Sequence, residues 1–494
     1  MNIGELLAFI LYFVIVLFIG VFFFLKTKSG GEKAYFLGNR QMNGWVSALS
    51  AGASDMSSWV LMGLPASILV SGFASVWIGI GLGIGTALAW ILIAPRLRRF
   101  SIEANDAITI PQYLTNRFRS KSKSLQIVCA IVFIVVYAIY SASSIKACGT
   151  LFNTVLGIDS TIAMLVAGGI IIVYTFLGGF SAVCWTDFVQ GMLMLAALLL
   201  VPIIALILIS SGKLPTYEVT GTENFWSFLP GGAWNYKSFA DIITGLGWGL
   251  GYFGMPHIIV RFMAIRSQKE VKKSAIIGTT WTWLILICAC GGVGLLGRVL
   301  FPELVGEGSS LVFIKMVRTI FPGFVSGVLL SAIIAASMST ADSQLLASAG
   351  AFASDVYKPV LRKNASDKEM MWAGRIIVIC VAVAAIIIAA LPNTGTIMSL
   401  VENAWGIFGA AFGPSILLSL FWKRFTYKGA VAGIVGGTVV DVLWLIFLKP
   451  VTGIYEIVPG FILGILIGVI VTLADHKPDQ EVKELFDRAV SSQK

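Results

Sequence analysis

Residues 47–59 read SALSAGASDMSSW, a run of small residues that holds one aspartate, Asp55. The sequence that follows is apolar, so the segment resembles part of a helix that crosses a lipid bilayer. A carboxylate at the centre of such a helix costs roughly 2.5–3.5 kcal/mol, even on the lenient insertion scale. Either the segment lies outside the membrane, or Asp55 has a function inside it.

The composition of the chain favours the membrane. Of its 494 residues, 57% are hydrophobic and 12% are charged, and the mean hydropathy is +0.90. Soluble domains carry about 25% charged residues. We therefore expect one all-α polytopic membrane domain. The opening stretch, MNIGELLAFILYFVIVLFIG, lacks the basic start and the cleavage site of a signal peptide, which predicts a retained helix.

Apolar stretches of spanning length recur from end to end and predict thirteen transmembrane helices. Their approximate ranges are 4–25, 42–71, 73–95, 124–152, 160–179, 183–210, 239–263, 274–299, 322–348, 374–391, 396–421, 429–448 and 455–474. Most of the 35 basic residues fall on one side if the amino terminus lies outside and the carboxyl terminus in the cytoplasm. This sidedness accounts for the net charge of +10, and no nucleic-acid motif accompanies it.

A second irregular segment matches the first. Residues 245–257, GLGWGLGYFGMPH, place glycines and Pro256 inside the seventh predicted span, where they weaken the helical hydrogen-bond ladder. Spans two and seven are an odd number of spans apart, so units that begin with them run in opposite directions. Interrupted spans at corresponding places of two halves indicate the binding site of a secondary transporter.

This interpretation divides the chain into two inverted repeats with additions at both ends. The predicted parts are an extra first helix with its loop (1–41), repeat one (42–210), an external loop (211–238), repeat two (239–421), two extra helices (422–474) and a cytoplasmic tail (475–494).

Other functional classes lack their signatures. The chain has two histidines, no clustered metal ligands and no phosphate-binding GxxxxGK[ST] loop. We expect neither an enzyme nor a nucleotide-binding pump, and His257 is interpreted as a structural hydrogen-bonding group. The six cysteines lie in apolar surroundings and are expected to pack without a metal.

Several runs resemble the sodium/solute symporter family, especially its bacterial sodium/proline symporter branch, over nearly the whole chain. These runs are SALSAGASDMSSWVLMGLP (47–65), YTFLGGFSAVCWTDFVQ (174–190), GWGLGYFGMPHI (247–258), LLSAIIAASMSTADSQLL (329–346), AWGIFGAAFGP (404–414) and FWKRFTYKGAVAGIVGG (421–437). The resemblance implies a leucine-transporter-type fold of five-plus-five inverted repeats, with one extra helix before them and two after. It also implies sodium-coupled import of L-proline across the bacterial inner membrane. Sialic acid, a sugar, pantothenate or acetate are alternative substrates, and proton coupling is an alternative to sodium.

The resemblance places a sodium site between spans two and nine. Its implied ligands are the carbonyls of Ala53, Met56 and Ala336 and the hydroxyls of Ser339 and Thr340, with Asp55 adding negative charge. Sodium is a hard cation that prefers such oxygens. The alternative for the two hydroxyls is hydrogen bonding to the preceding turn of their own helix.

Proline is a zwitterion with an apolar ring, so its pocket needs aromatic walls and a partner for the carboxylate. The expected substrate-binding residues are Ser57, Trp59, Tyr140, Trp248, Tyr252 and Pro256. Ordinary aromatic packing is the alternative for the rings.

Acidic residues in spans six and nine suggest a possible second cation site. Some relatives in the family use the span-six aspartate and span-nine hydroxyls for a second sodium. Here the aspartate is Asp187, and Asp342 and Ser343 would be its nearby partners. Structural hydrogen bonding near the membrane interface is the alternative.

Overall fold

A computed structural model describes residues 2–26, 31–306 and 308–491, and this part of the chain is helical apart from its connections and one isolated bridge between Met42 and Ile265. The α-helices are α1 (Ile3–Lys26), α2 (Glu32–Leu37), α3 (Gly44–Asp55), α4 (Leu64–Ser71), α5 (Val76–Leu88), α6 (Ala94–Glu103), α7 (Ile110–Arg117), α8 (Ser124–Leu156), α9 (Ser160–Ser210), α10 (Tyr236–Gly247), α11 (Pro256–Ala264), α12 (Gln268–Ile287), α13 (Leu296–Leu300), α14 (Val312–Ile320), α15 (Gly323–Phe352), α16 (Asp367–Ala390), α17 (Ile397–Phe421), α18 (Tyr427–Leu443), α19 (Lys449–Thr452), α20 (Ile457–Ala474) and α21 (Gln480–Ser491).

Short stretches of tighter or wider helix connect or extend these elements. The 3₁₀ turns are Gly38–Arg40, Phe73–Ser75, Pro230–Gly232, Trp248–Phe253, Pro302–Leu304 and Ser309–Leu311. The π-helical stretches are Trp59–Gly63, Ala89–Ile93, Cys288–Leu295, Ala353–Leu361 and Trp444–Leu448.

The predicted set of thirteen spans is recovered in large part. Within the described residues, ten helices are long and apolar enough to cross a membrane, and the bent pair α3 and α4 makes up to eleven. Two predicted spans fall short of that test. Span five corresponds to the shorter apolar helix Ser160–Val173, and span seven is divided among α10, a 3₁₀ turn and α11.

The first interruption lies between α3 and α4, which are bent by 59°. The α-helix ends at Asp55, and the Ser57 amide donates to the Asp55 carbonyl at 2.9 Å instead of reaching the Ala53 carbonyl. The helical ladder resumes after Ser58 in a π-helical stretch. The polar break expected from SALSAGASDMSSW is therefore present.

The second interruption replaces the middle of span seven with the 3₁₀ turn Trp248–Phe253. Pro256 then begins α11, where its missing N–H costs nothing. Glycine is required here by close packing: a Cβ built on Gly249 would lie 2.3 Å from the Gly81 carbonyl oxygen of α5. Both irregular segments recognised in the sequence are thus broken helices.

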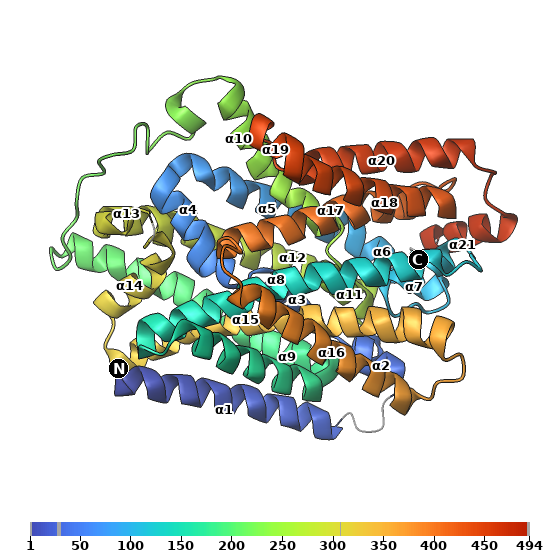
Figure 1. Cartoon of the computed structure of the whole chain (residues 1–494), viewed down its shortest axis with the longest axis horizontal. Helices are drawn as coiled ribbons and strands as arrows, with labels where there is room; N and C mark the ends of the chain where they lie inside the picture. Colours follow the sequence, from blue (N-terminus) through green and yellow to red (C-terminus); the bar gives the residue numbers. More distant parts are fainter. Residues whose placement is uncertain (1, 27–30, 307, 492–494) are drawn as a thin grey trace.

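The helices around α15 form the centre of the molecule. α15 packs against α1, α8 and α9, and α3 packs against α9, α11 and α12. Figure 1 shows α1 along one side of the bundle and α20 on the opposite side, where α18 and α20 pack together and against α17. α9 contains a sharp bend at Gly179, whose φ of 63° separates the predicted spans five and six.

Candidate functional site

The break after α3 exposes a backbone carbonyl to α15. The Ala53 carbonyl, released from its helical partner, accepts a hydrogen bond from the Ser339 hydroxyl at 2.8 Å. The same hydroxyl lies 3.2 Å from the Ala336 carbonyl oxygen in its own helix. Three of the five predicted sodium ligands therefore meet at one point between the two helices.

The other two predicted ligands lie beside this point in sequence. Thr340 follows Ser339 on α15, is fully buried, and its hydroxyl has no hydrogen-bond partner among the described residues. Met56 occupies the break itself with ψ 71°, outside the helical region. Carbonyls of unwound helices and neighbouring hydroxyls are the ligands that transporters use for sodium. This part of the site has the chemistry of an alkali-cation site.

The carboxylate of Asp55 has a different partner. It is 1% exposed, and its Oδ2 accepts a hydrogen bond from the Tyr252 hydroxyl. Its other oxygen, Oδ1, has no hydrogen-bond partner among the described residues. Asp55 and Tyr252 line a small cavity together with Thr86 and Thr282. The side chain of Asp55 thus connects the first broken helix to the second, through a residue predicted to bind substrate.

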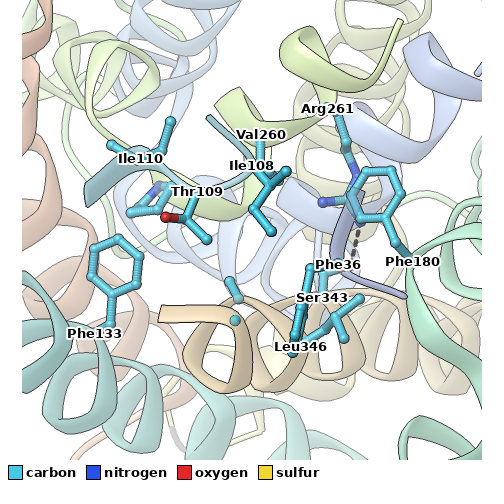
Figure 2. Close-up of a pocket in the computed structure, with 13 residues that line it drawn as sticks. Phe36, Ile108, Thr109, Ile110, Phe133, Phe180, Val260, Arg261, Ser343 and Leu346 are labelled. Carbon is cyan, nitrogen blue, oxygen red and sulfur yellow. Dashed lines mark hydrogen bonds between the residues drawn. The ribbon is translucent and has the colours of Figure 1, made fainter. Parts of the chain in front are cut away.

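The residues predicted for a second cation meet an arginine. The Arg261 guanidinium of α11 lies 2.8 Å from Asp187 Oδ2 and 2.5 Å from Ser343 Oγ, and its Nε donates to Ser50 at 2.7 Å. Ser343 Oγ lies 3.2 Å from Asp342 Oδ1. Figure 2 shows Arg261 pointing toward Ser343 at the edge of a pocket. The sequence predicted the acids and the serine, but it missed Arg261 as their partner.

The predicted aromatic residues form a buried row. The Trp59 and Trp248 rings are 6.1 Å apart, and the Trp248 and Tyr455 rings are 5.2 Å apart. Trp405 donates its indole N–H to the Trp248 carbonyl at 2.8 Å and packs edge-on against Tyr252 at 5.2 Å. Trp405 and Tyr455 were not predicted, because an aromatic residue in an apolar helix gives no sequence signal of its contacts.

Trp59 and Ser57, two of the predicted substrate-binding residues, form hydrogen bonds within the break of the first broken helix. The Trp59 indole N–H donates to the Asp55 carbonyl at 3.1 Å, and the Ser57 hydroxyl lies 3.5 Å from the Trp59 amide. Both side chains are buried. A structural role for Trp59 therefore accompanies any contact with substrate.

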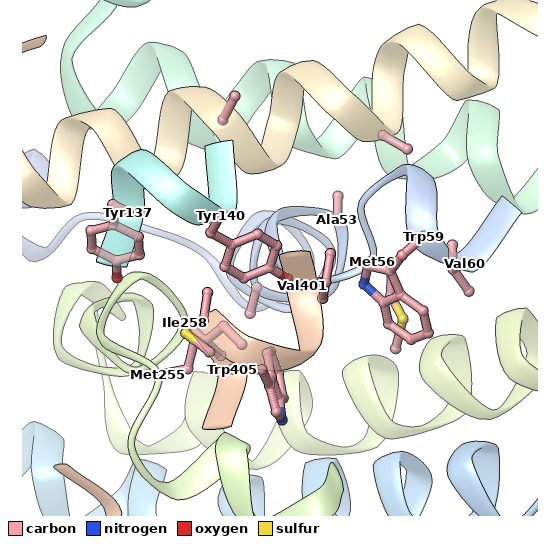
Figure 3. Packing of buried hydrophobic residues seen from close by; sticks show 14 of the residues in the cluster. Ala53, Met56, Trp59, Val60, Tyr137, Tyr140, Met255, Ile258, Val401 and Trp405 are labelled. Atoms are coloured by element: carbon pink, nitrogen blue, oxygen red, sulfur yellow. The ribbon is translucent and has the colours of Figure 1, made fainter. Parts of the chain in front are cut away.

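Tyr140 approaches the break from α8. Figure 3 shows its ring projecting toward the segment that carries Ala53, Met56 and Trp59. The ring of Tyr140 also lies 6.2 Å from that of His257, next to Pro256 at the start of α11. The predicted substrate residues thus come from α8 and from both broken helices.

His257 has the structural role expected of it. Its amide donates to the Tyr137 hydroxyl at 2.9 Å, and its Nε2 lies 3.1 Å from the Ser54 carbonyl oxygen at the end of α3. His257 therefore joins the two broken helices, and Tyr137, which was not predicted, joins α11 to α8.

A bundle of apolar helices with two interruptions, and with buried oxygens and aromatic rings where these meet, defines a secondary transporter. The chain belongs to the sodium:solute symporter family, whose family model matches residues 35–437. Membership of a transporter family also confirms the prediction that the chain is not an enzyme.

Similar proteins cover the chain from end to end. It is 41% identical to the osmoregulated proline transporter OpuE of Bacillus subtilis, over 98% of each chain. It is also 41% identical to the sodium/proline symporter of Escherichia coli, over 98% of this chain and 96% of that protein.

Solved structures confirm the fold class. A sodium-coupled sialic acid symporter in a substrate-bound, outward-open state superposes with a TM-score of 0.76 at 19% identity, covering 97% of this chain and 99% of that one. Mhp1, a nucleobase-cation-symport-1 family transporter, gives a TM-score of 0.55 at 14% identity, covering 92% and 98%. The chain therefore has the leucine-transporter-type fold, in a multi-pass membrane protein.

Proposed function

We propose that the protein imports L-proline by sodium-coupled symport with alternating access. Family membership and two proline-transporting relatives, each 41% identical over nearly the full length, support the substrate. Sodium as the coupling ion is supported by one contact: the Ser339 hydroxyl donates a hydrogen bond to the released Ala53 carbonyl at 2.8 Å. That contact joins the first broken helix to α15 at the point where oxygen ligands gather.

The proposed sodium ligands are the carbonyls of Ala53, Met56 and Ala336 and the hydroxyls of Ser339 and Thr340. Sodium would replace the Ser339–Ala53 hydrogen bond with bonds to both oxygens, and it would give the buried Thr340 hydroxyl a partner. In the ion-bound form the break would be held against α15 by the ion. Sodium thereby selects one conformation of the first broken helix.

The proposed substrate site uses the aromatic row and the ends of the broken helices. Trp59, Tyr140, Trp248 and Tyr252 supply walls for the proline ring and for its cationic imino group. The amino end of α11 at Pro256 and the Ser57 hydroxyl supply the positive potential and the donor that suit a carboxylate.

The Asp55–Tyr252 hydrogen bond is the proposed link between ion and substrate. Asp55 lies at the end of the helix that carries Ala53, and Tyr252 lies in the second broken helix. A sodium ion near Asp55 would keep its carboxylate ionised and the Tyr252 hydroxyl directed toward it. The Tyr252 ring would then already be fixed before proline binds, which reduces the conformational entropy lost on binding.

We also propose the orientation and the repeat boundaries given by the sequence. Repeat one would be residues 42–210 and repeat two residues 239–421, with the amino terminus outside. Impermeant amine reagents added to right-side-out vesicles should then modify Lys213 and Lys237. Modification of Lys272 and Lys358 in sealed vesicles would contradict the orientation.

Radiolabelled proline uptake into proteoliposomes tests the proposed function. An inward sodium gradient should drive accumulation, and a proton gradient of equal size should not. Excess unlabelled proline should compete, whereas sialic acid, a sugar, pantothenate and acetate should not. Uptake that follows the proton gradient, or that any of these solutes abolishes, would contradict the proposal.

A further inference from the structure

A second buried polar chamber lies between α3, α9 and α15, separate from the Ala53–Ser339 contact. Ser50 of α3 donates to Asp187 Oδ2 of α9 at 2.6 Å, and Ser343 of α15 faces the same point. All three side chains are buried. A carboxylate and two hydroxyls in a buried site form an oxygen-rich set that suits a cation.

The Arg261 guanidinium fills this chamber. Its Nη2 contacts both Asp187 Oδ2 and Ser343 Oγ, and its Nε donates to Ser50. A further N–H donates to the His257 carbonyl in the same helix, and the Phe180 ring lies 5.7 Å from the guanidinium carbon. Arg261 is 2% exposed. Its planar head is therefore held on several sides by hydrogen bonds.

We infer that Arg261 is the permanent cation of the Asp187 chamber, so that the protein binds a single sodium ion, at the Ala53–Ser339 site. An arginine side chain is always charged, and its fork of donors matches a carboxylate and neighbouring hydroxyls. The guanidinium and a sodium ion would need the same oxygens of Ser50, Asp187 and Ser343. As long as Arg261 occupies them, a second sodium has no ligands there.

The Asp187 chamber lies beside a pocket, so replacement of the Arg261 guanidinium by a sodium ion can be tested. Arg261 and Ser343 line the pocket in Figure 2, which extends past Thr109 and Ile110 to Pro256. Removing the guanidinium would therefore leave the oxygens of Asp187 and Ser343 unoccupied at the edge of this pocket. The unpaired carboxylate would then take a sodium ion in its place, because a buried charge without a partner is strongly unfavourable.

Equilibrium binding of radioactive sodium to the purified protein tests this inference, with ionic strength held constant by choline chloride. The wild type should bind one ion per molecule at saturation. Arg261→Gln should bind one more ion than the wild type, and Arg261→Lys should not. The double variant Asp187→Asn, Arg261→Gln should lose the additional ion, because it removes both charges of the pair.

Two results would overturn the inference: two sodium ions in the wild type, as Asp342 beside Ser343 would allow, or no additional ion in Arg261→Gln. If Arg261→Gln alone does not fold, the wild-type count decides, with the double variant as a folded control. The inference rests on the proposed sodium symport, but the experiment contains no proline. A wild type that binds one ion yet transports no proline would contradict only the proposed function.

Discussion

Replacing Ser339 by alanine removes a side-chain hydrogen bond that joins the first broken helix to α15 at the proposed sodium site. The hydroxyl donates to the Ala53 carbonyl at 2.8 Å and lies in a fully buried position. The substitution adds no atoms to this buried position, and alanine keeps the backbone helical. It therefore tests the ligand role with little other disturbance.

The magnitude follows from comparing the ion-free and ion-bound forms. A hydrogen bond or ligand bond from a hydroxyl to a charged group contributes about 1.5–3 kcal/mol, whereas a neutral hydrogen bond such as Ser339–Ala53 contributes about 1 kcal/mol. The substitution removes the neutral bond from the ion-free form and the stronger bond from the ion-bound form. The difference is about 0.5–2 kcal/mol, so the sodium dissociation constant should rise about tenfold.

Sodium-dependent proline binding to the purified variant measures this change, as a shift in the sodium concentration at half-maximal binding. Ser331→Ala is a matched control, since Ser331 is a buried serine of the same helix whose hydroxyl donates to the Gly327 carbonyl of its own helix at 2.8 Å. The control should titrate like the wild type. An unshifted titration for Ser339→Ala, or an equal shift in the control, would refute the ligand assignment.

Substitutions at Asp55, Trp248 and Asp106 test the ion site, the substrate site and a loop ion pair. Asp55→Asn keeps the shape of the side chain but loses its charge. A carboxylate next to a cation attracts it by roughly 3 kcal/mol at an effective dielectric of about 20, so apparent sodium affinity should fall about 100-fold. A stability loss with unchanged sodium dependence would make Asp55 structural. Trp248→Ala removes the middle ring of the row and should weaken proline binding by about 1–3 kcal/mol while a response to sodium persists; unchanged proline affinity would place the substrate elsewhere. Burial raises the pKa of the Asp106 carboxyl, but hydrogen bonds from Lys33 and Arg40 outweigh it and hold that pKa below its usual range. The stability that the Asp106 carboxylate contributes is thus complete above the unfolded pKa of about 3.9 and is lost as pH falls through the folded pKa. Asp106→Asn should therefore lower the Tm at pH 7 but not in strong acid. An equal loss of Tm at both pH values would contradict the assignment.

Local sequence signals predicted the interruptions well. Glycine, proline and a run of small polar residues weaken a helix wherever they occur, so the breaks at Met56 and before Pro256 followed from composition alone. The count of spans was less exact, because hydropathy measures apolar length rather than helix continuity. The segment 239–263 is apolar enough to be predicted as a span, yet its backbone is divided into three pieces.

The partners within the site were harder to predict. The pairing of Ser339 with the Ala53 carbonyl was expected only through family resemblance, and the Asp55–Tyr252 bond joins residues 197 positions apart. Arg261 lies near the end of the predicted span 239–263, and nothing in the local sequence marks it as a buried partner of the acidic residues. Its burial against Asp187 depends on how α9 and α11 pack, which no local pattern encodes.

The central claim is that one sodium ion at the first broken helix prepares the site for proline. Its most direct test is the proline dissociation constant of the purified wild type, measured across a sodium titration at constant ionic strength. Thermodynamic linkage makes the effect reciprocal: the factor by which sodium raises proline affinity equals the factor by which proline raises sodium affinity. A coupling free energy of about 1–3 kcal/mol corresponds to a factor of about 5 to 150. A reciprocal change of this size is expected. A proline affinity that is the same with and without sodium would contradict it.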